Sequence, residues 1–151
     1  GVGGMDEFER MLELRGKGFY CSQILLLMGM DLLGKENADL VRAVHTLSGG
    51  IGFSGETCGA LTGGACLLGL YAGKGAPEEE DDPRLMFMAE DLVKWFKADV
   101  GGKYGGIRCD EILGESSKDM GTRCPAIVLD TYQKIKELLV ENGFELGGEE
   151  W

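Results

Sequence analysis

Histidine is almost missing from this chain of 151 residues, where His45 is the only one. An acid–base pair of histidines is therefore excluded, and a lone helical histidine is more often an ordinary packed or exposed residue than a metal ligand. Basic residues are also scarce: 15 Lys and Arg stand against 26 Asp and Glu, so the formal net charge is −11. Nucleic acids and anionic membrane surfaces require clustered Lys and Arg, so neither is expected as a partner.

Several familiar motifs are missing as well. No two cysteines form a C-x-x-C pair, which excludes a zinc ribbon and a thioredoxin-type motif, and no C-x-x-C-H attaches a haem. No segment alternates like a strand, no repeat is present, and no G-x-G-x-x-G follows a strand, so a nucleotide-binding α/β fold is not expected.

No charged and then apolar leader opens the chain. Residues 1–4 are interpreted as an artificial leader before Met5. A cytoplasmic protein is expected, with a removed leader as the alternative.

Helical periodicity accounts for most of what remains. It predicts an all-α fold: one domain over residues 5–151, a bundle of five or six helices with glycine-rich loops. Asn37 and Asp82 are expected as helix N-caps. The longest uncharged stretch, residues 57–73, is interpreted as a buried central helix rather than a membrane span. The expected helices cover residues 6–15, 21–33, 37–47, 57–71, 83–100 and 124–142, with a short turn at 110–113 and loops at 48–55, 73–82, 101–106 and 116–122.

Glycine is abundant, with 26 residues. Gly59 and Gly63 have the G-x-x-x-G spacing, which Gly64 and Gly69 continue along the expected central helix. Such a face lets another helix approach closely, either inside the fold, which is favoured, or across a homodimer through the segment Gly59–Gly69. Gly49 to Gly55 form either a tight connection or a set of N–H donors for a site near Cys58.

The five cysteines carry the functional signal. Cys21, Cys58, Cys109 and Cys124 all fall at or just before an expected helix start, where partial positive charge and free N–H groups lower the pKa of a thiol. The thiolate is the form that binds metals and attacks disulfides. Cys66 lies within an expected helix and is interpreted as a small core residue. The alternative is that all of them are small buried apolar residues.

The residues that begin at Cys58 read C-G-A-L-T-G, a C-G-A-x-x-G string. With Cys21 before it and Cys109 and Cys124 after it, this string resembles the family of putative redox-active proteins named for its C, GCAxxG, C, C pattern. The resemblance runs from about Gly18 to Pro125. The family is similar in size and mostly bacterial and archaeal, and it implies a redox role for the cysteines. A related domain in a multihaem cytochrome of sulfate reducers is associated with an iron–sulfur site. Only the cysteine site would carry over here, because the haem motif is absent.

Three functions are consistent with these residues. The first is a metal site of Cys21, Cys58, Cys109 and Cys124, in particular an iron–sulfur cluster for electron transfer with an unidentified redox partner, zinc being the other thiolate-bound metal considered. The second is a thiol–disulfide protein in which two of the cysteines cycle between dithiol and disulfide. The third is a non-catalytic assembly protein that pairs through its glycine-faced helix and merely buries its cysteines.

Overall fold

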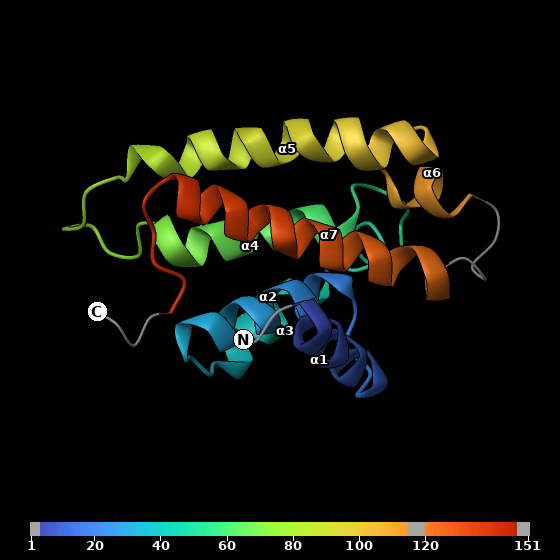
Figure 1. The fold of residues 1–151 in the computed structure, drawn as a ribbon, viewed down its shortest axis with the longest axis horizontal. Coiled ribbons are helices and arrows are strands. Elements are labelled where there is room, and N and C mark those ends of the chain that lie inside the picture. The colour runs from blue at the N-terminus through green and yellow to red at the C-terminus, as the bar shows by residue number, and fades with distance from the viewer. Residues whose placement is uncertain (1–3, 115–119, 148–151) are drawn as a thin grey trace.

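The structure, a computed structural model, describes residues 4–114 and 120–147, and these fold into helices joined by loops (Figure 1). Within these residues no strand is present, and the all-α prediction is confirmed. The described residues form seven helices rather than the predicted five or six, because the short turn after residue 108 is a helix of its own. The helices are α1 (Gly4–Gly16), α2 (Cys21–Leu33), α3 (Ala38–His45), α4 (Gly59–Ala72), α5 (Pro83–Tyr104), α6 (Cys109–Leu113) and α7 (Met120–Glu141).

Helix α4 occupies the centre of the bundle. It packs against α2, α5 and α7, while α1 packs on α2 and α7, and α3 on α2. Figure 1 shows α5 along one side, α4 and α7 across the middle, and α1 to α3 on the other side. The prediction of a buried central helix is thereby confirmed. None of the helices among the described residues combines the length and apolar character that crossing a membrane requires.

The close approach of α2 and α4 depends on glycine. A Cβ atom on Gly63 would lie 2.8 Å from both the Cα and the carbonyl oxygen of Ser22 in α2. A Cβ on Gly64 would lie 2.9 Å from Ile135 of α7, whereas Gly69 faces open space. The G-x-x-x-G face is therefore already used inside the fold, and a homodimer through this helix stays a prediction.

The predicted helix signals act as expected at several ends. The Asn37 side chain accepts hydrogen bonds from the backbone N–H groups of Asp39 and Leu40, at 3.0 and 3.3 Å, before α3. Asp82 accepts one from the N–H of Arg84 at 2.9 Å, before α5. Both N-cap predictions are confirmed, and the caps satisfy N–H groups that a helix start leaves without a partner.

Two predicted boundaries are wrong. Helix α5 continues past Val100 to Tyr104 through two glycines that were assigned to a loop. Val100 is buried and Tyr104 packs on the core, and this burial offsets the cost of glycine in a helix. Helix α7 starts at Met120 rather than at Cys124. Residues 116–119 of the predicted loop, and residues 1–3 of the predicted leader, lie outside the described part of the chain.

Candidate cysteine site

A short backbone pairing joins the segments that carry Cys58 and Cys109. Thr57 and Arg108 form an antiparallel bridge. On either side of it, the N–H of Cys58 donates to the carbonyl of Ile107 at 2.9 Å, and the N–H of Cys109 donates to that of Glu56 at 2.6 Å. The bridge therefore holds side by side two cysteines that are 51 positions apart in sequence: Cys58, the residue before α4, and Cys109, the first residue of α6.

Cys21, the first residue of α2, lies against the start of α4. A Cβ on Gly59 would lie 2.7 Å from the Cys21 Sγ, so the missing side chain makes room for this sulfur. The amide oxygen of Gln23 accepts the N–H of Tyr20 at 3.2 Å and holds the turn that precedes Cys21. Gly59 thus has a direct role at the site as well as in the packing of the two helices.

The glycine-rich connection between α3 and α4 forms a left-handed turn beside Cys21. Residues 49–53 all have a positive φ, including Ile51 at 64° and Phe53 at 60°. This conformation is costly for a β-branched residue, by about 1–3 kcal/mol. Glycine is required at position 49, where a Cβ would lie 2.3 Å from the Phe53 ring. The turn therefore places the half-exposed Phe53 ring in close contact with Gly49.

His45 lies outside the group of cysteines. Its ring stacks on Tyr20, with 5.8 Å between the ring centroids, and Tyr20 in turn meets the edge of Phe53 at 5.3 Å. Tyr20 and Phe53 line the cavity described next, but His45 does not. His45 therefore packs in an aromatic cluster beside the site and does not line the cavity with the cysteines.

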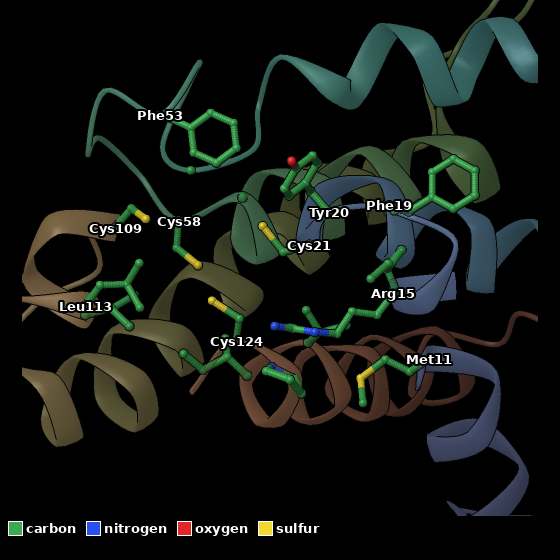
Figure 2. A pocket seen from close by; sticks show the side chains of 18 residues that line it. Met11, Arg15, Phe19, Tyr20, Cys21, Phe53, Cys58, Cys109, Leu113 and Cys124 are labelled. Carbon is green, nitrogen blue, oxygen red and sulfur yellow. The ribbon is translucent and has the colours of Figure 1, made fainter. Parts of the chain in front are cut away.

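The four cysteines predicted as site residues line one cavity of about 230 Å³. Figure 2 shows the side chains of Cys58 and Cys124 directed toward each other, with Cys21 and Cys109 above them. Most of the remaining wall is apolar, including Met11, Phe19, Ile24, Ile112, Ile127 and Val128. All four cysteines are free thiols. The structure brings them together, while their role as ligands stays a prediction.

Burial reverses the expected effect of the helix starts on the thiols. Removal from water is the largest influence on each of the four, and it raises the pKa of Cys58 and of Cys124 to about 12. The pKa values of Cys21 and Cys109 are also raised, again first by burial. Hydrogen bonds from the backbone N–H groups of Gly49 and Gly59 lower the pKa of Cys21, but their effect is smaller than that of burial. The prediction of lowered pKa values is wrong for the metal-free protein, because desolvation outweighs the helix effect.

Two cysteines differ from their predicted settings. Cys124 is the fifth residue of α7 and not a helix start, because α7 begins four residues earlier, at Met120. Cys66 is exposed on α4 rather than packed in the core. Helix α4 contacts other helices on only part of its surface, and the face with Ala65 and Cys66 is open. Cys66 is not among the residues that line the cavity.

One charged residue of the cavity was not predicted. Arg15 lines it, and its positive charge slightly opposes the burial that raises the pKa of Cys124. The sequence did contain a signal, since Arg15 comes four residues after Met11 and so falls on the same side of helix α1 as that apolar residue. A charged residue in an apolar stripe marks either a helix end or a site.

The four thiols line the same cavity, but they do not form a recognisable ion site. Among the described residues, no group of three or more His, Cys, Asp or Glu side chains is placed to hold one metal ion. A tetrahedral zinc site needs four ligand atoms at about 2.0–2.3 Å from a common centre. The described residues therefore contain no preformed ion site, and a metal held by the four cysteines stays a prediction.

The raised thiol pKa values make stability dependent on pH. The thiol of Cys58 ionises near its ordinary pKa of 9.0 when unfolded and near about 12 when folded. Because the pKa of the folded state is the higher one, the stability gained by keeping this thiol protonated is fully present below pH 9. It is lost as the pH rises to about 12. In that window each such thiol lowers the free energy of unfolding by about 1.4 kcal/mol per pH unit.

Urea unfolding of the reduced, metal-free protein at several pH values checks this expectation. Cys58→Ala removes the titrating group and should give a shallower decline of stability above pH 9, the ordinary pKa of the thiol. Equal slopes for the variant and the parent protein would contradict the assigned burial of Cys58.

A comparison with models of protein families gives one match, over residues 19–138. The matching family is described as putative redox-active protein (C_GCAxxG_C_C). The chain belongs to this family. The match covers all four cysteines of the cavity and confirms the resemblance read from the sequence. Searches of curated proteins and of solved structures gave no significant match.

Proposed function

We propose that Cys21, Cys58, Cys109 and Cys124 hold an iron–sulfur cluster that serves in electron transfer. The observation that carries the proposal is the shared cavity: four free thiols from four separate segments line it. Four cysteine thiolates are the usual ligand set of two-iron and four-iron clusters. When bound, such a cluster takes up and gives up single electrons. Membership of a family described as redox-active supports the same function.

The residues around the cavity suit a thiolate-bound group. The largely apolar wall reduces the access of water to the sulfurs, and solvent exposure is one of the factors that set the potential of such sites. Backbone N–H groups of Gly49 and Gly59 act on the Cys21 sulfur and stabilise its thiolate. A coordinating thiol is deprotonated by the metal itself, so the raised pKa values of the free thiols do not oppose binding. A reducing compartment such as the cytoplasm would keep the thiols available.

The same pKa values argue against a thiol–disulfide protein. Reactive cysteines of that class have pKa values lowered to about 3.5–7.5 and lie in electropositive, accessible settings. Here burial raises the pKa of Cys58 and Cys124 to about 12. At neutral pH almost none of either thiol is ionised, so attack on a disulfide would be slow.

Anaerobic reconstitution with ferrous iron and sulfide tests the proposal. We expect the chain to retain iron and acid-labile sulfide in equal amounts, with visible absorption that dithionite bleaches. Retention of one zinc ion without sulfide, or of no metal, would contradict a cluster. A free-thiol count before and after mild oxidation checks the disulfide alternative, which predicts a change of two in the metal-free protein.

A further inference from the structure

Two aromatic side chains form part of the border between the cysteine cavity and solvent. Tyr20 and Phe53 both line the cavity, yet they are 40% and 56% exposed. The Phe53 ring meets Tyr20 edge to face, with 5.3 Å between the ring centroids, and Tyr20 stacks on His45 at 5.8 Å. Both geometries are favourable for aromatic pairs. The rings therefore support one another at the rim of the cavity.

An unusual backbone holds the Phe53 ring at this rim. Residues 49–53 are all in the left-handed region, which is unfavourable for any residue with a side chain. The turn is nonetheless fixed by hydrogen bonds: the N–H of Phe53 donates to the carbonyl of Ser48 at 3.1 Å, and that of Glu56 to the carbonyl of Gly50 at 3.0 Å. Ser48 is itself buried. Strain that the surrounding structure maintains in this way is typical of functional sites.

The same turn connects the Phe53 ring to the sulfur of Cys21. The ring lies against Gly49, where an added Cβ would be 2.3 Å from a ring carbon. The backbone N–H of Gly49 forms a hydrogen bond to the Cys21 sulfur. In Figure 2, Cys21 lies between Phe53 and Tyr20 on one side and Cys124 on the other. The backbone of Gly49 is therefore in contact both with the ring and with the sulfur.

We propose that Phe53 is a positioning residue of the cysteine site, whose ring covers the Gly49 backbone and limits access from solvent to the Cys21 sulfur. The inference deepens the proposed function, on which it rests. Hydrogen bonds to the sulfurs and solvent exposure are among the factors that set the potential of an iron–sulfur cluster. Phe53 acts through Gly49 and through the exclusion of water, and it is not a ligand.

Maleimide and its bulkier derivative N-phenylmaleimide test this cover in the reduced, metal-free protein. Both reagents are neutral and add to the same thiolate, so the ratio of their rates at one cysteine cancels its degree of ionisation. Cys21 is the reporter, because it lines the cavity and is partly exposed. Exposed Cys66, outside the cavity, is the internal reference in the same sample. Cys124, on the opposite side of Cys21 in Figure 2, reports any opening of the whole cavity. Peptide mass spectrometry resolves the three sites.

Phe53→Ala should raise the N-phenylmaleimide-to-maleimide rate ratio at Cys21 several-fold and leave the ratio at Cys66 unchanged. Phe53→Tyr should keep the ratio of the parent protein, because it retains the ring. Ile51→Ala is the matched control: Ile51 is in the same turn with a φ of 64°, is 51% exposed, and does not line the cavity. Phe53→Gly removes the ring and tolerates a positive φ, so it replaces the Ala variant if circular dichroism shows that the latter is unfolded.

A Cys21 ratio unchanged within twofold in Phe53→Ala would overturn the proposal. An equal rise in Ile51→Ala or in Phe53→Tyr would do the same, as would an equal rise at Cys124, which would indicate that the whole cavity had opened.

In the reconstituted protein, Phe53→Ala should also shift the one-electron reduction equilibrium several-fold toward the reduced state. The reduced cluster carries the larger negative charge, which water stabilises. An unchanged equilibrium would contradict the exclusion of water by Phe53. If the parent protein binds no iron, the proposed function fails, while the maleimide ratios still decide the role of Phe53.

Discussion

Cys58→Ser should reduce the iron and sulfide retained by the reconstituted protein to below about a tenth of the parent value. Loss of one ligand removes a metal–sulfur bond, and changes in the outer shell alone already cost about 10–100-fold in metal affinity. Cys58 is the most constrained of the set, since its N–H is fixed by Ile107 and its side chain is 7% exposed. Serine preserves the size of the side chain, so the helical fold should persist.

Cys66→Ser is the matched control. It makes the same substitution in the same part of the chain, at an exposed cysteine that does not line the cavity. Its iron and sulfide content should equal that of the parent protein. Equal losses in the two variants, or full retention in Cys58→Ser, would contradict the assignment of the four ligands. Circular dichroism of both variants separates ligand loss from unfolding.

Gly63→Ala should destabilise the protein by about 1–3 kcal/mol, the usual cost of adding a methyl group to a filled site. The new Cβ would lie 2.8 Å from the Cα and carbonyl oxygen of Ser22. These are backbone atoms, so no change of rotamer relieves the contact, and α2 and α4 must separate. The gain of about 1 kcal/mol from replacing glycine in a helix offsets only part of this cost. Chemical denaturation monitored by circular dichroism measures the change.

Gly69→Ala adds the same methyl group to the same helix, at a position where no atom lies within 4 Å of the new Cβ. It should stabilise the protein by up to about 1 kcal/mol. Opposite signs for the two variants would support the internal use of the glycine face. A comparable loss of stability in Gly69→Ala would indicate that this open position is covered by another molecule, such as a second copy of the chain.

Much of the fold was accessible from local sequence signals. Asn37 and Asp82 act as N-caps because a short polar side chain before a helix satisfies its free N–H groups. The central position of α4 followed from its uncharged sequence. The exposure of Cys66 did not, because a helix that is apolar all round carries no periodicity to show which face stays open.

The cysteine site was predicted less completely. The identity of its four members came from their positions and the family pattern, but their proximity depends on tertiary contacts. The bridge of Thr57 with Arg108 and the close approach of Gly59 to Cys21 join segments far apart in sequence. The direction of the thiol pKa shifts was wrong, since the depth of burial cannot be read from a helix start. Arg15 was missed because its helical spacing with Met11 was not interpreted as placing it at a site.

The visible absorption spectrum of the protein isolated anaerobically from cells, without reconstitution, tests the central claim most directly. If the four cysteines hold an iron–sulfur cluster, the parent protein will show visible absorption that dithionite bleaches, and Cys58→Ser isolated in the same way will lack it. A colourless parent protein with five titratable thiols, the full number in the chain, would contradict the claim.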